Sequence, residues 1–449
     1  MKQSLAVRYG APVPRYTSYP TAPHFSAEVG ADSYATWLSA LPAEKPISLY
    51  MHIPFCDEMC WYCGCFTKIV KRYTPISAYL DTVLHESELV SAHMPTRMKV
   101  SHVHWGGGSP TMLKPEDWQR TMDRLHALFE INTDAELAVE LDPRTTTREY
   151  VEALAKAGIN RVSIGVQDFD AKVQKAINRI QPFETTSTVV GWLRDAGITA
   201  INLDLMYGLP HQDLDKIERM TALALDLQPT RIALFGYAHV PWMRAHQRLI
   251  DESVLPDAEA RWAQAEVAAN ILTRAGYVRI GFDHFAHPDD PMAAAAESGE
   301  LKRNFQGYTT DDTDTLIGLG ASSIGTLPHG YVQNSASIRE YQRLVGADTL
   351  PITRGLQVTD EDLLRRRVIE ELMCHLRVDL PPLCEAFARP VEHFDSTLAT
   401  FNEFVGDGLL KIEGRTLEVT ALGRPLVRAI AAGFDTYLEC GAARHSSAV

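Results

Sequence analysis

Long apolar runs are absent from this sequence of 449 residues. No stretch reaches the ~18–20 consecutive apolar residues that a membrane-spanning helix needs. The first residues, MKQSLAVRYGAPVPRYTSYPTAP, also lack the apolar core of a secretory signal peptide. We therefore expect a protein of the cytoplasm that has no membrane partner.

Positive charge is scarce as well. Lysine and arginine number 43 against 57 aspartates and glutamates, so the formal net charge is −14. Nucleic acids and anionic membranes would repel a chain this acidic, and we therefore expect no nucleic-acid partner. The global charge still leaves room for a local basic pocket that binds an acidic small molecule.

Cysteine is sparse, and its distribution is uneven. Four of the seven cysteines fall within residues 56–65. In a reducing cytosol, clustered cysteines indicate metal or redox chemistry more than disulfide bonds. The other three, Cys374, Cys384 and Cys440, stand alone, so the sequence has no second cysteine pair. The cluster is the first candidate for a functional site.

Short apolar segments that end in polar or glycine-rich turns alternate with segments of helical spacing. This repeat predicts parallel strands joined by right-handed crossovers, as an open sheet or a (β/α) barrel. In both, chemistry gathers at the carboxyl ends of the strands. The predicted strands are 47–53, 101–105, 136–141, 161–166, 200–209 and 231–238, and the predicted helices include 76–90 and 149–158, the latter closed by Gly158 as its C-cap.

The two ends of the chain differ from this alternating middle part, 46–350. Residues 1–45 are rich in proline, tyrosine, serine and threonine and are expected to form an irregular arm over the active site. Within 351–449, a helix is predicted over 359–376, where a Thr-Asp pair can cap it. Residues 401–434 follow the order helix, strand, turn, strand, helix. We expect a small, mostly helical, winged-helix-like C-terminal domain.

Unusual polar residues follow the predicted strands, and nearly all of them lie at the carboxyl ends. A scaffold without a site there would scatter such residues along the chain. They are Cys56–Cys65 after the first strand, GGGSP (106–110) after the second, Glu140 near the end of the third, Gln167 and Asp168 after the fourth, Asp204 and YGLP (207–210) in the fifth, and Tyr237–Ala238–His239 after the sixth.

Cys56, Cys60 and Cys63 place three thiolates within one tight loop. Such a loop can hold a [4Fe–4S] cluster, which usually takes four cysteine ligands. Three ligands leave one iron open for a substrate or cofactor, unless Cys65 closes the cluster. Zinc, with His52 as a further ligand, is the rival metal, although it commonly uses two separated ligand pairs. Buried free thiols are the third interpretation.

The pattern Cys-x-x-x-Cys-x-aromatic-Cys, with Tyr62 at the aromatic position, resembles the signature of radical S-adenosylmethionine enzymes. Further motifs, in order, make nearly the whole chain similar to the oxygen-independent coproporphyrinogen III oxidase family. This resemblance implies a partial (β/α)6 barrel and a monomer. The motifs are Cys65, TSYPTA (17–22), HWGGGSPT (104–111), GVQDF (165–169), INLDLMYGLP (201–210), YAH (237–239), DHFA (283–286), RNFQGYTT (303–310) and FDTYL (434–438).

The resemblance implies a reaction and its cofactors. Cys56, Cys60 and Cys63 would hold a [4Fe–4S] cluster whose open iron chelates S-adenosylmethionine, and a flavodoxin-type protein would donate electrons. The 5′-deoxyadenosyl radical would take a hydrogen from the β-carbon of a propionate of coproporphyrinogen III. Loss of an electron to an acceptor, and of CO2, then leaves a vinyl group, and two such steps give protoporphyrinogen IX. No acid–base pair is needed, and no catalytic residue is assigned; Cys65 keeps an open role.

The resemblance also implies two molecules of S-adenosylmethionine. At two positions the chain departs from the family, where threonine is frequent in place of Ser109 and phenylalanine in place of Tyr62; hydroxyl and aromatic character are retained. The first molecule would contact Tyr50, Gly107, Glu140 and Ile324, and the second Tyr62, Gly108, Ser109, Gln167, Arg179, Asp204 and Ala238.

The substrate carries four propionates, so an acidic protein must oppose them with local cations. The candidates near the motifs are Arg15, Lys68, Lys71, Arg72 and Arg303. The arm that carries Tyr19 is expected to cover the substrate, because a radical needs protection from solvent. His239 and His284 are candidates for handling protons or, equally, for a structural role.

Two other functions compete with the oxidase. One is a related haem chaperone of the same superfamily, which lacks the extra cysteine and much of the arm. Cys65 and TSYPTA therefore favour the oxidase. The other is a transcriptional regulator that uses the C-terminal domain, but its recognition helix would carry only Arg424 and Arg428 to contact phosphates.

Overall fold

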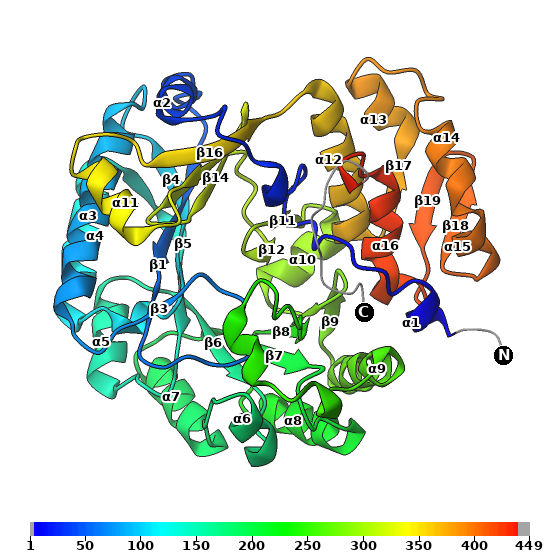
Figure 1. The fold of residues 1–449 in the computed structure, drawn as a ribbon, viewed down its shortest axis with the longest axis horizontal. Helices are drawn as coiled ribbons and strands as arrows, with labels where there is room; N and C mark the ends of the chain where they lie inside the picture. Colours follow the sequence, from blue (N-terminus) through cyan, green and yellow to red (C-terminus); the bar gives the residue numbers. More distant parts are fainter. Residues whose placement is uncertain (1–3, 439–449) are drawn as a thin grey trace.

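Six parallel strands form the centre of the computed structural model, which describes residues 4–438 (Figure 1). All six predicted strands are confirmed, and each neighbour in the sheet is also the next predicted strand in the chain. The six are β1 (Ile47–Ile53), β4 (Lys99–Gly107), β5 (Glu130–Leu141), β6 (Arg161–Gln167), β7 (Ala200–Tyr207) and β8 (Arg231–Gly236).

These strands are apolar along most of their length because both faces of the sheet are covered. In β1, ISLYMHI, every residue except Tyr50 is buried. Helices flank the outer face (Figure 1). They are α3 (Thr74–Ala92), α4 (Pro115–Leu128), α5 (Arg148–Lys156), α6 (Ala171–Ala176), α7 (Phe183–Asp195), α8 (Leu214–Asp226) and α9 (Ala258–Arg274).

Both predicted helices of the barrel are present, as α3 and α5. Helix α5 begins where the Thr147 side chain accepts the N–H of Tyr150. Its C-cap is Ala157, and Gly158 is the next residue, at φ +86°. The predicted C-cap is therefore off by one: Gly158 lies just beyond the cap, where glycine is favoured in the left-handed conformation.

The barrel is partial, as expected, because β1 and β8, the first and last of the six strands, pair with other strands and not with each other. Beside β1 lies the parallel strand β13, and beside β8 the antiparallel strand β10, so the twelve-stranded sheet has two free ends. The sheet continues past residue 350. Its other strands are β9 (Val278–Ile280), β10 (His284–Ala286), β13 (Leu316–Leu319), β14 (Ile324–Leu327), β15 (Gly330–Asn334) and β16 (Ile352–Gln357).

Smaller elements complete the barrel. Helix α11 (Ile338–Val345) lies beside α3, and α10 (Pro291–Ser298) lies beside β9. Two short pairs stand apart from the large sheet, β2 (Phe55–Cys56) with β3 (Lys68–Ile69) and β11 (Lys302–Asn304) with β12 (Gly307–Thr309). Along residues 4–438, no helix combines the length and apolar character that crossing a membrane requires.

The N-terminal arm runs from the C-terminal domain to the barrel (Figure 1). It is not irregular throughout, since it contains α1 (Leu5–Arg8) and α2 (Ala31–Ser39), and α2 packs into the main core. Between them, the Tyr16 hydroxyl donates to Asp435 at 3.0 Å. The N–H of Tyr19 donates to the hydroxyl of Tyr331 at 3.3 Å. The arm is therefore fixed to both parts of the molecule.

The C-terminal domain is mostly helical, as predicted, and has its own apolar core. A capping box joins Thr359 and Asp362 at the start of its longest helix, and Leu364, Val368 and Leu372 are buried along one face. A three-stranded sheet has the order β17-β19-β18. The elements are α12 (Asp360–His375), β17 (Arg377–Asp379), α13 (Leu380–Ala386), α14 (Asp395–Leu398), α15 (Asn402–Gly406), β18 (Leu410–Glu413), β19 (Thr416–Val419) and α16 (Val427–Ala431).

One buried carboxylate joins α3 to the antiparallel end of the large sheet. Glu86 accepts hydrogen bonds from the Gly320 N–H at 2.7 Å, the Tyr341 hydroxyl at 2.6 Å and the Asn334 amide at 2.5 Å. Burial raises the pKa of Glu86 to about 7 in spite of these donors. The fold therefore favours the protonated acid near neutral pH.

We predict that Glu86→Gln removes part of the pH dependence of stability. The pKa of Glu86 is higher in the folded chain than in the unfolded one, so this group's contribution is complete below pH ~4.5 and is lost as pH rises through 7. The loss amounts to about 3 kcal/mol. Thermal unfolding from pH 5 to 8 should show a flatter profile for Glu86→Gln. The exposed Glu297→Gln is the control, and a Glu86→Gln profile parallel to the wild-type one would contradict the prediction.

Candidate active site

The cysteine loop follows β1 and lies across the carboxyl ends of the parallel strands. Neighbouring segments hold its backbone from two sides. The Asn178 amide donates to the Met59 carbonyl at 2.9 Å, and the Gln247 amide donates to the Tyr62 carbonyl at 2.9 Å. The loop is thus fixed by contacts from the turn after α6 and from the 3-10 helix at 245–249.

A cavity of about 540 Å³ opens beside this loop, and we call it the cysteine cavity. The strand ends of the barrel meet there, as the sequence predicted. It brings together most of the predicted site residues, namely Cys56, Cys60, Cys63, Tyr62, Gly107, Gly108, Ser109, Glu140, Gln167, Arg179, Asp204 and Ala238, and also Cys65.

Two predicted residues do not line the cysteine cavity. Tyr50 lies on β1, and its hydroxyl is 2.9 Å from Nδ1 of His52. Ile324 begins β14, and its backbone lies close to Gly318, the residue that pairs with Tyr50. Tyr50 stands beside Glu140, since a Cβ at Gly106 would lie 2.7 Å from Oε1 of Glu140 and 3.1 Å from the Tyr50 ring.

The glycine run lets the backbone of β4 pass close to its neighbours. Gly107 has φ +117°, and its N–H donates to Oε2 of Glu140 at 3.0 Å. A Cβ at Gly107 would be 2.5 Å from the ring of His52, and one at Gly108 would be 2.7 Å from the carbonyl oxygen of Phe55. Larger residues would displace the cysteine loop or fill the space in front of it.

Two carboxylates of the cavity have opposite environments. Burial acts to raise the pKa of Glu140, but hydrogen bonds from His104 and Gly107 outweigh it and hold the pKa below its usual value. Burial and the charge of Glu140 raise the pKa of Asp204 to about 6. Asp204 accepts hydrogen bonds from Ser163 at 3.0 Å and Asn202 at 2.8 Å. Both groups can accept hydrogen bonds from an ammonium or from ribose hydroxyls.

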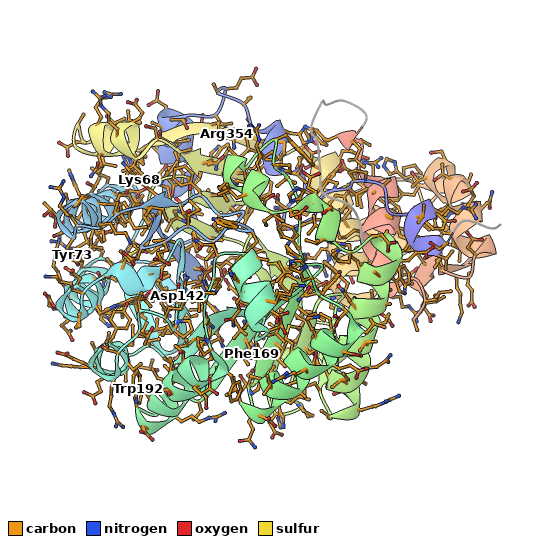
Figure 2. The ribbon with its side chains drawn as sticks, turned by 60° about the horizontal axis from the view of Figure 1, so that its bottom comes forward. Lys68, Tyr73, Asp142, Phe169, Trp192 and Arg354 are labelled. Atoms are coloured by element: carbon orange, nitrogen blue, oxygen red, sulfur yellow. The ribbon has the colours of Figure 1, made fainter. Side chains whose placement is uncertain are left out.

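Two arginines and one aspartate surround Cys60. Arg144 and Arg179 each place a guanidinium nitrogen 3.6 Å from its sulfur. Asp142, labelled in Figure 2, accepts from Arg144 at 2.7 Å and lies 3.4 Å from Arg179. These cations hold the pKa of Asp142 below its usual value although burial acts to raise it. Within residues 4–438, Nε of Arg179 is buried without a hydrogen-bond partner.

Sequence reasoning missed Asp142 and Arg144. The available signal was their position, since LDPR follows the third predicted strand directly. A strand-end aspartate and arginine are common in turns, and nothing local shows that Arg144 reaches Cys60 or that Asp142 reaches Arg179.

The thiols differ from one another. Burial raises the pKa of Cys56 to about 12, whereas hydrogen bonding from Cys65 lowers the pKa of Cys63 to about 7. The N–H of Cys65 lies 3.4 Å from the sulfur of Cys63. In the described part of the chain, no three His, Cys, Asp or Glu residues are arranged around a single-ion site. The thiolates of an iron–sulfur cluster bind separate irons, so three cysteines spread along one cavity wall fit such a cluster.

The predicted substrate cations divide into two groups. Arg15 lines the cysteine cavity, and Arg303 donates to the backbone carbonyl of Arg15 at 3.4 Å. Lys68, Lys71 and Arg72 lie outside this cavity. The arm therefore contributes Arg15 to the cavity wall. Tyr19 lies elsewhere, buried where its hydroxyl is 3.1 Å from that of Thr436.

Both candidate histidines are paired. In His239, Nδ1 lies 2.7 Å from the Tyr237 hydroxyl and Nε2 lies 2.9 Å from Glu252. In His284, Nδ1 lies 2.6 Å from Asp283. These contacts fit structural roles, and neither histidine lines the cysteine cavity.

We predict that Gly108→Ala destabilises the fold and that Gly64→Ala does not. The new Cβ at 108 would meet the backbone of Phe55, which cannot rotate away, whereas nothing lies within 4 Å of a Cβ at 64. Forced overpacking of this kind costs ~1–3 kcal/mol. Melting temperatures of the two variants and the wild type test the difference. Equal melting temperatures for all three would show that the β4 contact has more room than the structure gives it.

Comparison with known proteins identifies the family that shares this architecture. The radical SAM superfamily model matches residues 50–224. The chain is 49% identical to the oxygen-independent coproporphyrinogen III oxidase of Bradyrhizobium diazoefficiens, over 100% of both chains. It is 46% identical to that of Cereibacter sphaeroides, over 99% of this chain and 98% of the relative.

A solved structure agrees with these relatives. The coproporphyrinogen III oxidase of Escherichia coli, described as a radical SAM enzyme, superposes with a TM-score of 0.91 at 36% identity. The match covers 98% of this chain and 100% of the other. With its full-length relatives and its partial barrel, the chain belongs to the oxygen-independent coproporphyrinogen III oxidase family of the radical SAM superfamily.

Proposed function

We propose that this chain decarboxylates two propionates of coproporphyrinogen III oxidatively and without oxygen, giving protoporphyrinogen IX. One observation carries the proposal. Cys56, Cys60 and Cys63 share a cavity with the Asp142–Arg179 pair, in a chain that matches oxidases of this name over its full length. Three thiolates, a glycine-lined wall and fixed charges are what a radical reaction at a bound cluster requires.

The three cysteines would hold a [4Fe–4S] cluster. When bound, it supplies the electron that cleaves S-adenosylmethionine and so generates the radical that removes hydrogen from a propionate. Arg144 and Arg179 point N–H groups at Cys60, so they offset the negative charge of its thiolate. Cys65 lies next to Cys63 and is exposed, and we assign it no ligand role.

The rest of the lining of the cysteine cavity suits a charged nucleoside cofactor, and we propose that the cavity binds two molecules of S-adenosylmethionine. Without a side chain, Gly107 leaves room for the amino-acid part, and Glu140 can accept from its ammonium or ribose. Arg179 retains a buried Nε–H that can donate to a carboxylate. The first molecule is assigned to Tyr50, Gly107, Glu140 and Ile324, and the second to Tyr62, Gly108, Ser109, Gln167, Arg179, Asp204 and Ala238.

The rest of the proposal concerns the setting of this chemistry. We assign residues 1–45 to the covering arm, 46–350 to the catalytic barrel and 351–449 to the helical domain, with β16 extending the barrel sheet past residue 350. We propose a cytoplasmic monomer that receives electrons from a flavodoxin-type protein. Removal of a hydrogen atom needs no strong base, so the chain's residues have to bind, orient and exclude water rather than move a proton.

The regulator interpretation conflicts with the placement of Arg428. This side chain is buried, and it donates to the carbonyls of Pro14 at 3.0 Å and Val13 at 2.6 Å. A recognition helix would need it exposed to phosphate. The haem chaperone remains a defined alternative, which an assay of decarboxylation distinguishes.

We predict that anaerobically reconstituted protein converts coproporphyrinogen III to protoporphyrinogen IX when it is given reductant and S-adenosylmethionine. Cys60→Ala should lose both this conversion and the absorbance near ~400 nm of a thiolate-bound cluster. Cys384→Ala is the matched control, because this cysteine is buried in the C-terminal domain. Full cluster and activity in Cys60→Ala would refute the ligand assignment, and haem binding without decarboxylation by the wild type would favour the chaperone.

A separate prediction concerns the number of cofactor molecules. Equilibrium dialysis of the reconstituted enzyme should give two equivalents of S-adenosylmethionine per chain. Asp204→Asn should weaken one of them by about tenfold, since a hydrogen bond to a charged group is lost. Asp134→Asn is the control, because Asp134 is exposed in the first half of β5, outside the cysteine cavity. One equivalent in the wild type would overturn the two-molecule proposal.

A further inference from the structure

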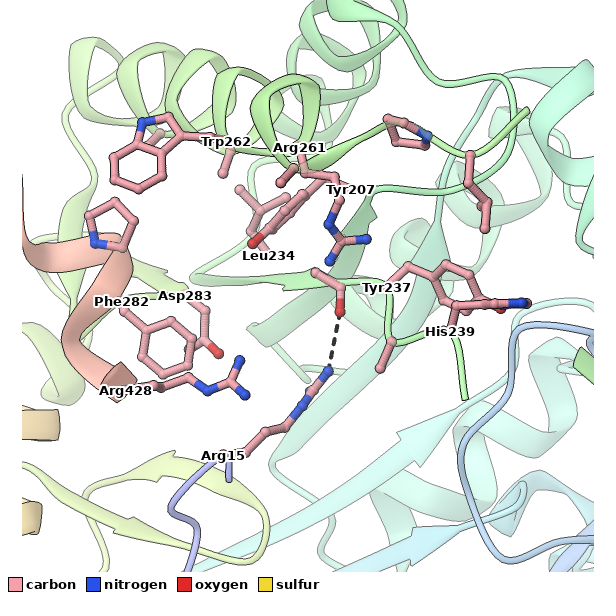
Figure 3. A pocket seen from close by; sticks show the side chains of 18 of the residues that line it. Arg15, Tyr207, Leu234, Tyr237, His239, Arg261, Trp262, Phe282, Asp283 and Arg428 are labelled. Carbon is pink, nitrogen blue, oxygen red and sulfur yellow. Dashed lines mark hydrogen bonds between the residues drawn. The ribbon is translucent and has the colours of Figure 1, made fainter. Parts of the chain in front are cut away.

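A second cavity, of about 360 Å³, adjoins the cysteine cavity, and the two share Arg15, Gly236, Tyr237 and Ala238. We call it the arginine cavity. Figure 3 shows that it lies between the strand ends of β7 and β8, helix α9, the arm and helix α16. Of its described lining residues, only Ala238 is among those assigned to S-adenosylmethionine.

Cations dominate the lining of the arginine cavity. Its described lining contains Arg15, Arg261, Arg279 and Arg428, but a single carboxylate, Asp283. Asp283 is held by His284 at 2.6 Å, and Arg279 donates to Glu266 at 3.2 Å. An acidic chain that gathers arginines in one hollow has a local field opposite to its net charge, which attracts anions.

The guanidinium groups of Arg15, Arg261 and Arg428 point toward the same space in Figure 3. Burial and the charge of Arg15 lower the pKa of Arg261, and they lower that of Arg428 to about 10. Burial is the larger cause in both residues, and repulsion from Arg15 adds to it, in agreement with the shared space that Figure 3 shows. A carboxylate between them would relieve that repulsion.

The remaining walls are aromatic. One side of the cavity carries Trp242 at its exposed edge, 47% accessible, and the deeper wall includes Tyr207, Trp262, Phe282 and Phe285. Aromatic faces suit pyrrole rings, and arginines suit carboxylates. The combination matches a tetrapyrrole with acidic side chains better than a small inorganic anion, which needs no apolar surface.

We propose that the arginine cavity binds propionate carboxylates of the substrate that are not reacting, while a further propionate reaches past Arg15 into the cysteine cavity. This proposal rests on the proposed function. Arg15 stands on the shared wall, where it donates to the Gly236 carbonyl at 3.2 Å. The cysteine cavity then contains the reacting propionate and the radical chemistry. The arginine cavity binds the tetrapyrrole through its other carboxylates.

Arg428 acts on this site as a positioning residue. Its hydrogen bonds to Val13 and Pro14 fix the backbone directly before Arg15. Arg15 is therefore placed by the C-terminal domain as well as by the barrel. Because Arg428 is buried, its substitution would disturb the fold, and the test uses Arg15 and Arg261 instead.

The test is a fluorescence titration of the full chain with coproporphyrin III, the stable oxidised form of the proposed substrate, which needs no radical chemistry. Arg15→Gln and Arg261→Gln should each raise Kd by about tenfold, as expected for the loss of one charge-assisted hydrogen bond. Arg15→Lys should restore part of the affinity. Arg219→Gln, on the exposed face of α8 and outside both cavities, is the control and should bind like the wild type.

The outcomes separate this proposal from the proposed function. If both glutamine variants keep the wild-type Kd while the wild-type enzyme is active, the proposal that the arginine cavity binds substrate carboxylates is refuted. The proposed oxidase function is then retained. Wild-type protein that neither binds coproporphyrin nor converts coproporphyrinogen overturns the function. Displacement of coproporphyrin by equimolar inorganic phosphate shows a general anion site and also overturns the proposal. If Arg261→Gln does not fold, the exposed Arg15 decides the result.

Discussion

Parallel pairing of the six central strands is the constraint on which the site depends. Each strand must be followed by a crossover before the next begins, so all six carboxyl ends meet at one edge. Cysteines, glycines, carboxylates and arginines that are far apart in the sequence thereby line one cavity. The partial closure of the barrel matters equally, because a closed barrel of eight strands is filled by side chains and would leave no such space.

Within that cavity, the charged side chains around Cys60 contact partners of opposite charge. Asp142 stands between Arg144 and Arg179, and both arginines also approach the sulfur of Cys60. A buried carboxylate without those cations would be protonated or would destabilise the fold. The same three side chains therefore stabilise the edge of β5 and fix the position of the thiolate. The contacts that stabilise the fold here are therefore also the contacts that position the sulfur of Cys60.

The sequence predicted the repeating part of the fold well, because local apolar periodicity is enough to mark β1, the strands from β4 to β8, and helices α3, α5 and α12. It did not predict β9, β10 or β13 to β16, which are short strands of three to six residues. The candidate site was also largely predictable, since strand-end residues share an edge. Asp142 and Arg144 were missed because the contact of Arg144 with Cys60, and that of Asp142 with Arg179, depend on three-dimensional proximity.

The arm illustrates the same limit. Its composition predicted an irregular cover over the active site, but α2 packs into the main core, and Arg15 rather than Tyr19 lines the cavity. Its link to Arg428 joins residues from opposite ends of the chain. Because the ribosome makes the arm well before α16, the wall that carries Arg15 cannot be completed until α16 has been made. A growing chain can thus shape the barrel early, yet this wall is finished only after the helical domain has been added.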